Sequence, residues 1–133
     1  GPKPNDRELE TAILETTTRL VPDPVLVIEQ WLQWRRENPV SSRNALSQLL
    51  AAALYRAPDK RPIEHLLLLA GARDALVDPR CSLQLAAQWE APIAIHPEAG
   101  HDLPLDDDAW VLAQIELWLE SLEEDPGHAT RIA

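Results

Sequence analysis

Residues 65–79 read HLLLLAGARDALVDP, and this stretch decides the predicted fold. It contains the end of an almost wholly apolar run, residues 63–70, which lies between Pro62 and Gly71. A short apolar run between proline and glycine is typical of a strand that is buried on both faces, as in a parallel sheet. We therefore expect a strand that includes residues 66–70, followed by a turn that carries Asp74.

The rest of the second half continues this pattern. Asp78 and Pro79 predict the start of a helix that runs to Trp89, because aspartate caps a first turn and proline suits the first helical position. Residues 92–96 predict a second strand, residues 97–107 a loop, and residues 109–122 a final amphipathic helix. Asp106, Asp107 and Asp108 are expected to cap this last helix, where carboxylates also meet the positive end of the helix dipole. Strand, helix, strand and helix is the order of a right-handed crossover unit, so the expected fold class is α/β.

The first half predicts helices. Apolar residues recur at helical spacing in three segments of residues 3–60, and prolines separate these segments. The expected N-caps are Asn5 in a capping box with Glu8, Asp23 before Pro24, and Ser41 or Ser42. In the third segment one continuous apolar face is expected, made of Leu46, Leu49, Leu50, Ala53 and Leu54.

The two ends of the chain are set apart from this organisation. The chain contains no methionine and opens with Gly1 and Pro2, which is typical of the remnant left when a protease removes an expression tag. We therefore expect a tag remnant at residues 1–2 and a piece of a longer protein after it. The expected divisions are a helical region over 3–60, an α/β segment over 61–123 and a tail over 124–133.

Charge is unevenly distributed. Residues 81–130 hold eleven acidic residues and neither lysine nor arginine, and the net charge of the chain is −10. An acidic half repels phosphate groups, which argues against binding to nucleic acid or to anionic membrane surfaces. The apolar runs are far shorter than the ~20 residues of a membrane span, and no secretory signal is visible, so a cytoplasmic location is expected. The single cysteine, Cys81, fits a reducing compartment and is expected to be buried.

Asp74 and His101 are the candidate catalytic residues. Asp74 follows the first predicted strand in the sequence GARD, and His101 follows the second in the sequence AGHD. The carboxyl ends of adjacent parallel strands meet at one edge of a sheet, where α/β proteins place their functional groups. A carboxylate beside an imidazole orients the ring so that its other nitrogen acts as a general base. We therefore expect these two side chains to meet.

Residues 66–89 and 92–119 resemble the C-terminal segment of an α/β-hydrolase. In that family the acid follows the penultimate strand in a Gly-x-x-Asp turn, matched here by Gly71 to Asp74. The histidine follows the last strand in a Gly-His turn, matched by Gly100 and His101, and a closing helix comes after it. The resemblance covers residues 63–122, and it implies that the helices of residues 3–60 correspond to the cap that such enzymes insert before this segment.

The nucleophile of that family is absent from the sequence. No Gly-x-Ser-x-Gly occurs, and none of the five serines has flanking glycines (Ser41, Ser42, Ser47, Ser82 and Ser121). The family's oxyanion-hole loop is missing as well. The resemblance therefore implies a fragment of an esterase-like serine hydrolase that is inert alone, in which Asp74 orients His101 and neither cofactor nor metal takes part.

A partner is expected for two reasons. The resemblance implies a missing hydrolase half, with a small-molecule ester as the substrate of the intact enzyme. Independently, two parallel strands do not make a stable sheet alone, and the first strand would leave an apolar edge unpaired. Either the missing half or a second copy of the chain is expected to cover that edge.

Two other interpretations stay open. One is a non-enzymatic α/β module that binds a partner or oligomerises through an acidic face. The other is a metal- or redox-dependent enzyme that uses His96, His101 and Cys81, with Asp102 as a further ligand. Asp78 competes with Asp74 for the role of the acid, although its position before Pro79 accounts for it as an N-cap. We expect His96, at the end of a strand, to be structural or to line the rim.

Overall fold

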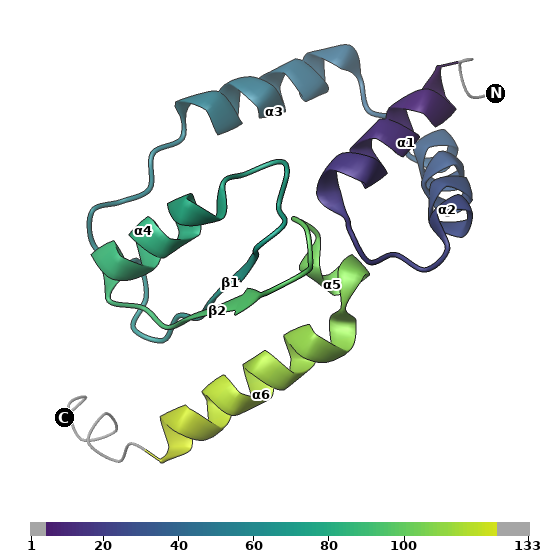
Figure 1. Ribbon diagram of the computed structural model, residues 1–133. Coiled ribbons are helices and arrows are strands. Elements are labelled where there is room, and N and C mark those ends of the chain that lie inside the picture. Colours follow the sequence, from purple (N-terminus) through teal and green to yellow (C-terminus); the bar gives the residue numbers. More distant parts are fainter. Residues whose placement is uncertain (1–4, 125–133) are drawn as a thin grey trace.

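The apolar run after Pro62 forms a strand, but a shorter one than expected. In the computed structural model, which describes residues 5–124, strand β1 spans Leu68–Gly71 and strand β2 spans Ile93–His96. The two strands pair in parallel over their full length, as predicted (Figure 1). The predicted residues 66 and 67 precede the pairing, because β2 offers only four residues to which β1 can bond.

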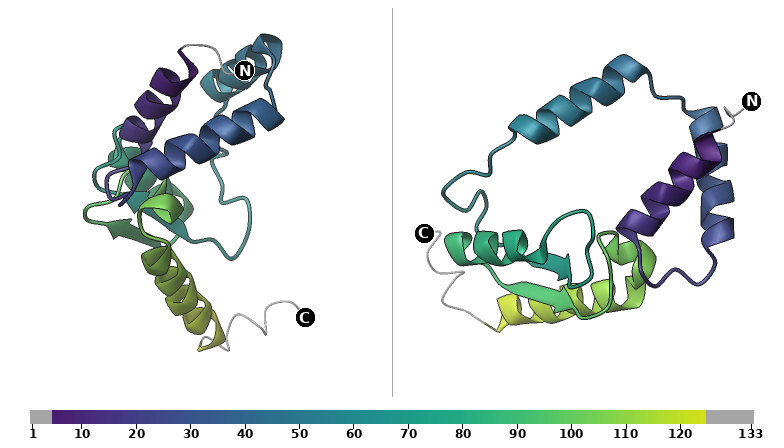
Figure 2. Two further views of the ribbon diagram at one scale, coloured as in Figure 1. Left: turned by 90° about the vertical axis from the view of Figure 1, so that its right-hand side faces the viewer. Right: turned by 45° about the horizontal axis from the view of Figure 1, so that its top comes forward.

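Two helices flank the strand pair. Helix α4 (Pro79–Trp89) connects the strands, and helix α6 (Asp108–Glu123) follows β2 after the one-turn helix α5 (Leu103–Asp106), which lies in a segment predicted to be a loop. Figures 1 and 2 show α4 and α6 on opposite sides of the strands. The described residues therefore form an α/β structure in the broad sense, with six helices and one small parallel sheet.

The first two helices share a small apolar core. Helix α1 (Asp6–Thr17) packs against helix α2 (Pro24–Glu37), and the buried side chains between them are Leu14, Ile28 and Leu32. Across the same contact, the guanidinium of Arg35 lies 2.7 Å from the carboxylate of Glu10. Since both Glu10 and Leu14 are buried on α1, one face of this helix supplies the apolar packing and the ion pair together.

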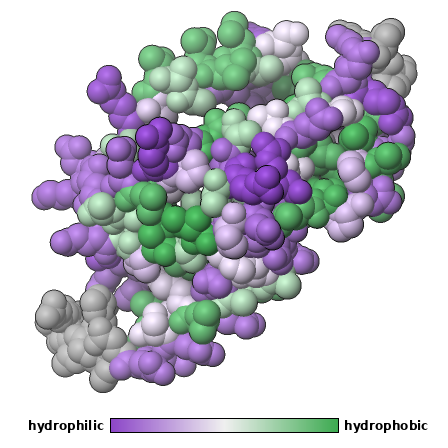
Figure 3. Space-filling model, in the orientation of Figure 1, coloured by the Kyte–Doolittle hydropathy of each residue, from purple (hydrophilic) through white to green (hydrophobic). Residues whose placement is uncertain are grey.

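Helix α3 (Ser42–Leu54) was predicted correctly as a helix, yet none of its residues is buried. The same is true of α6. The leucines expected to form the apolar face of α3 are between 54% and 78% exposed (Leu46, Leu49, Leu50 and Leu54). Figure 3 shows a hydrophobic surface along this helix. Among the described residues no helix is both long enough and apolar enough to cross a membrane.

The predicted helix caps are confirmed in three places and wrong in one. Asp23, Ser41 and Asp78 each accept a backbone hydrogen bond from the first turn of their helix. Asn5 precedes α1 but makes no side-chain capping bond, so the predicted capping box is absent. The caps of α2, α3 and α4 fit the rule that a short oxygen-bearing side chain satisfies a free amide at a helix start.

The three aspartates before the last helix have different roles, although all three were expected to cap it. Asp107 is the N-cap, because its Oδ1 accepts a bond of 3.0 Å from the Trp110 amide, whereas Asp108 is already the first helical residue. Asp106 is buried and turns away from α6, toward the end of α1. A charged side chain in the interior needs hydrogen-bond donors, and α6 does not supply them here.

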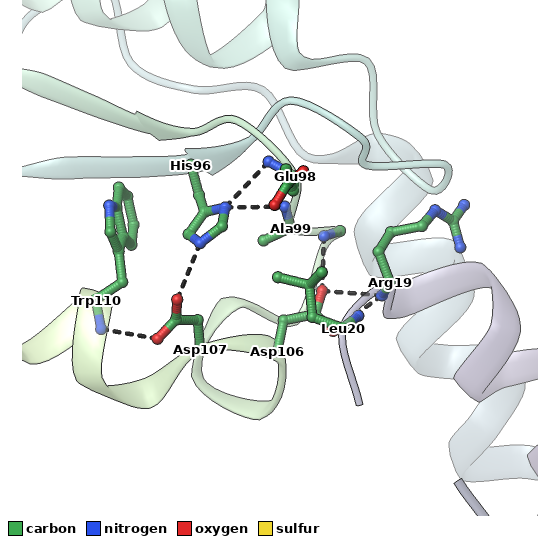
Figure 4. Close-up of polar contacts among 9 residues, drawn as sticks. Arg19, Leu20, His96, Glu98, Ala99, Asp106, Asp107 and Trp110 are labelled. Carbon is green, nitrogen blue, oxygen red and sulfur yellow. Dashed lines mark hydrogen bonds and ion pairs between the residues drawn. The ribbon is translucent and has the colours of Figure 1, made fainter. Parts of the chain in front are cut away.

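The carboxylate of Asp106 joins the helical half of the chain to the α/β half. It accepts hydrogen bonds from the backbone amides of Arg19, Leu20 and Gly100, at 2.7–3.0 Å (Figure 4). The Asp102 amide adds a bond of 2.8 Å to the carbonyl oxygen of Thr17, the last residue of α1. The start of the loop after α1 is therefore fixed to the turn after β2 by backbone groups and one carboxylate.

We predict that Asp106→Ala loosens this junction. The buried amide of Gly100 and the partly buried amides of Arg19 and Leu20 lose their acceptor, and an unsatisfied buried donor costs about 1–3 kcal/mol. We expect a loss of at least about 3 kcal/mol in the free energy of unfolding, measured with urea, and faster hydrogen exchange at the amides of Arg19 and Leu20.

Asp108→Ala is the matched control, since it removes an exposed carboxylate two residues away. Its effect should stay within about 0.5–1 kcal/mol, the range for a carboxylate in a first turn. Equal losses for the two variants would contradict the role assigned to Asp106.

Gly71 provides a second test of the fold. A Cβ at this position would lie 2.1 Å from the carbonyl oxygen of Gly100 and 2.5 Å from that of Ala99. Both are backbone atoms, which cannot move aside without displacing the turn after β2. Gly71→Ala should therefore cost about 3 kcal/mol or more of unfolding free energy, at or above the upper end for overpacking.

The control for this substitution is Gln84→Ala, at an exposed position of α4. It should change the free energy of unfolding by no more than about 0.5 kcal/mol. A Gly71→Ala variant as stable as this control would show that the two turns do not approach each other as described.

Candidate functional site

Asp74 and His101 meet beyond the carboxyl ends of the two strands. Asp74 lies three residues beyond the end of β1, and His101 lies five residues beyond the end of β2. The Nδ1 atom of His101 is 2.7 Å from the Oδ2 atom of Asp74. The expected proximity of the two side chains, 27 positions apart in sequence, is therefore confirmed.

Backbone contacts between the two turns bring this pair together. The Ala72 amide donates to the carbonyl oxygen of His96 at 2.8 Å, and the Arg73 amide donates to that of Ala99 at 3.0 Å. Gly71 permits the approach, because any side chain would meet the carbonyl groups of the second turn. Backbone hydrogen bonds between the two segments thus continue for two residues beyond the end of β1, up to the residue before Asp74.

The carboxylate of Asp74 is held in place and remains ionised. Its Oδ1 accepts bonds from the amides of Leu76 and Val77, at 2.8 and 2.9 Å, and its Oδ2 faces His101. Partial burial opposes ionisation of Asp74, but the bonds from Val77, His101 and Leu76 outweigh it, so its pKa lies below the usual value. The side chain is only 11% exposed.

The His101 ring has one nitrogen in use and one open. An ionised carboxylate can only accept hydrogen bonds. In the neutral ring, Nδ1 of His101 therefore carries the proton and donates a hydrogen bond to Asp74. Among the described residues, Nε2 of His101 has no hydrogen-bond partner, and the side chain is 43% exposed. A neutral imidazole in this tautomer presents a lone pair on Nε2 and accepts a proton there.

A second aspartate–histidine pair joins β2 to the start of α6, and its histidine is buried while its aspartate side chain is 37% exposed. Nε2 of His96 is 3.1 Å from Oδ2 of Asp107, and Nδ1 of His96 accepts bonds from the amides of Glu98 and Ala99 (Figure 4). The edge of the ring packs against Trp110, with 5.0 Å between the ring centroids. His96 was expected to be structural or to line the rim, and its exposure of 6% fits the structural role.

Sequence reasoning missed two members of this region. Asp106 and Asp107 were both interpreted as helix caps, and only Asp107 is one. The signal available in the sequence was the run of three aspartates itself, because a helix start needs at most one or two of them. The partners of the additional carboxylates come from residues 19, 20 and 96, which lie too far away in sequence for local patterns to identify.

The hydroxyl groups of the described residues do not extend the pair to a triad. Ser41 caps α3, Ser47 and Ser121 donate to backbone carbonyls of their own helices, and no serine or threonine in residues 5–124 bonds to His101. Asp78, the competing acid, caps α4 and pairs with Arg80 at 2.6 Å. Of the two aspartates, Asp74 contacts His101, whereas the printed partners of Asp78 belong to residue 80.

The interpretation as a metal- or redox-dependent enzyme required His96 as a ligand. Both ring nitrogens of His96 already have protein partners, so this histidine has no free lone pair to offer a metal ion. In the described part of the chain, no three potential metal-binding side chains come together. Cys81 is exposed, and the prediction that it is buried was wrong, since the buried residues of α4 are Ala86 and Trp89.

A groove of about 1170 Å³ lies on the helical side of the molecule, between α1, the end of α2 and α3. Its apolar lining includes Leu9 and Ile13 of α1 and Leu49 of α3, and Arg36 lies among its polar residues. Ile13 is one turn before Thr17, whose carbonyl binds the residue after His101. Helix α1 therefore contributes to the groove through Leu9 and Ile13, and to the contact with the turn that carries His101 through Thr17.

Comparisons of the chain with protein-family models, with curated protein sequences and with solved structures give no match.

The depressed pKa of Asp74 predicts a pH dependence of stability. A carboxylate whose pKa is lower in the folded than in the unfolded chain stabilises the fold above its unfolded pKa, near 3.9, and loses this contribution as the pH falls through its folded pKa. Asp74→Asn should therefore cost about 1–3 kcal/mol above pH 5, and the difference from wild type should shrink below pH 4 in urea titrations.

Asp59→Asn serves as the control, because it replaces an exposed carboxylate. It should change stability by no more than about 0.5 kcal/mol at every pH. A wild-type advantage over Asp74→Asn that grows on acidification would contradict the hydrogen bonding described for Asp74.

Proposed function

We propose that this chain is part of a serine-type α/β-hydrolase that cleaves carboxylic esters, and that it supplies the acid and the base of the catalytic triad. The observation that carries the proposal is the 2.7 Å contact between His101 Nδ1 and Asp74 Oδ2, with Nε2 of the ring open in the described structure. This is the arrangement by which a carboxylate fixes the basic tautomer of a histidine. The chain alone is inert, since its sequence has no Gly-x-Ser-x-Gly.

The proposed reaction uses His101 twice. Nε2 accepts the proton of a serine hydroxyl as the serine oxygen attacks the ester carbonyl carbon, and the resulting imidazolium returns that proton to the leaving alkoxide when the ester C–O bond breaks. Nε2 then accepts a proton from water, whose oxygen attacks the acyl group, and the serine leaves with that proton restored. Asp74 stays ionised throughout and stabilises the charged ring, which agrees with its depressed pKa.

The partner in this proposal is the half of the enzyme that bears the nucleophile. Its need is supported by the two-stranded sheet, in which each strand has one edge unpaired in the described residues, and by the absence of buried residues from α3 and α6. The exposed large apolar side chains number nineteen in residues 5–124, which is typical of a surface that another polypeptide covers. A second copy of the chain is the other candidate for this surface.

The proposed substrate of the intact enzyme is a small-molecule ester, the class that the resemblance to α/β-hydrolases implies. A small-molecule ester fits a general base at a half-exposed rim, and the groove between α1 and α3 offers an apolar lining for its acyl part. In this proposal residues 3–60 act as the cap of the enzyme. Neither a metal ion nor a cofactor takes part in the chemistry.

The non-enzymatic interaction module is the second candidate. The exposed apolar face of α3 favours it, because such a face suits binding of any apolar partner. It does not account for the alignment of Asp74 with His101, whose open nitrogen has no structural duty in the described residues. Ester hydrolysis by the assembled protein therefore distinguishes the hydrolase from the interaction module.

The first test is the coding sequence that precedes Lys3. A serine hydrolase of this class requires a Gly-x-Ser-x-Gly about 80–130 residues before Asp74, which leaves room for the nucleophile turn, its helix and the cap. When the two parts are expressed as one polypeptide, hydrolysis of p-nitrophenyl esters should fall by about 10³- to 10⁴-fold in both His101→Ala and Asp74→Asn.

Asp78→Asn is the control in that assay, because asparagine also caps a helix and residue 78 lies outside the pair. It should retain wild-type turnover. The isolated chain should release no p-nitrophenol above the buffer rate. Efficient turnover by the isolated chain, or full activity of the His101→Ala enzyme, would overturn the proposed function.

A further inference from the structure

We infer that His96 is a positioning residue, whose neutral ring holds the turn after β2 in the shape that brings His101 to Asp74. The inference rests on the proposed function for its catalytic meaning, but its geometry is a property of the chain itself. His96 does not touch the reacting groups. It acts through the backbone of Glu98, Ala99 and the residues that follow.

The first step of the argument is the tautomer of His96. Two backbone amides point at Nδ1, from Glu98 at 3.1 Å and from Ala99 at 3.0 Å, so this nitrogen acts as an acceptor (Figure 4). In the neutral ring the proton then lies on Nε2, which donates to Oδ2 of Asp107 at 3.1 Å. Each polar atom of the buried ring has one defined role.

The second step follows the turn from His96 to both members of the catalytic pair. The amide of Ala99 is held by the His96 ring, and the carbonyl oxygen of Ala99 accepts the bond from Arg73, the residue before Asp74. The next amide, that of Gly100, binds Asp106, and His101 follows directly. The position of Ala99 therefore sets the positions of Asp74 and His101 at the same time.

The third step separates this role from simple packing. Ala99 is completely buried and His96 is 6% exposed, so water does not replace the ring as an acceptor for the Ala99 amide. A side chain of similar volume without an acceptor at the Nδ1 position leaves this buried amide unsatisfied, and the turn then rearranges to satisfy it. The critical property of residue 96 is thus an acceptor at one place rather than its size.

Two isosteric substitutions test this property on the isolated chain. In His96→Asn the side-chain oxygen takes the place of Nδ1 and keeps the acceptor, whereas in His96→Gln the terminal amide takes the place of Nε2 and keeps only the donor to Asp107. The readout is the pair of ¹⁵N resonances of the His101 ring at neutral pH, which distinguishes a protonated from an unprotonated nitrogen.

Wild type and His96→Asn should show protonated Nδ1 and unprotonated Nε2 in His101. In His96→Gln the two resonances should approach a common average, corresponding to a fall of about fivefold to tenfold in the equilibrium constant for the Asp74–His101 pair. The midpoints of urea unfolding are measured in parallel. If both variants proved too unstable, His96→Ser would be compared with His96→Ala in the same way.

The outcomes separate the two proposals. If wild type itself lacks the fixed tautomer of His101, the pairing with Asp74 fails and the proposed function fails with it. If wild type has the tautomer and His96→Gln keeps it fully, His96 does not position the pair and this inference is overturned, while the proposed function stands. If His96→Asn and His96→Gln lose the pairing equally, the acceptor is not the critical property and the inference is again overturned.

Discussion

The close approach of two turns is the constraint on which the described structure depends. The turn after β1 bonds to the turn after β2 through the amides of Ala72 and Arg73, and Gly71 allows the contact because it has no side chain. The turn after β2 is also bound to the end of α1, through Asp106 and Thr17. One cluster of backbone hydrogen bonds thus fixes the site and also joins the helical half to the sheet.

Local patterns were sufficient to predict the elements and the central pair. Proline, glycine and capping aspartates gave the positions of α2, α4 and both strands to within a few residues, because these residues act on the backbone beside them. The meeting of Asp74 with His101 was also predictable, since parallel neighbouring strands end at the same edge.

The support around the pair was not predictable in the same way. Asp106 and His96 obtain their roles from backbone amides, some of them far away in sequence. Since every residue type except proline carries the same backbone amide, such a partner cannot be identified from the sequence. Three consecutive aspartates look alike in the sequence, yet one is buried, one caps a helix and one is exposed. Likewise, the leucines of α3 predicted a helix correctly, but their pattern cannot tell which surface covers them.

The exposed leucine face of α3 has a thermodynamic consequence. A helix of 13 residues is close to the length at which isolated helices are marginal in water, and α3 buries none of its own residues in this chain. Its helical order is therefore expected to be coupled to whatever polypeptide covers it, with formation of the helix and association contributing to a single equilibrium. Part of the binding free energy is then used to order this segment. The affinity of the association therefore depends on the helix propensity of α3 as well as on the contacts that it makes.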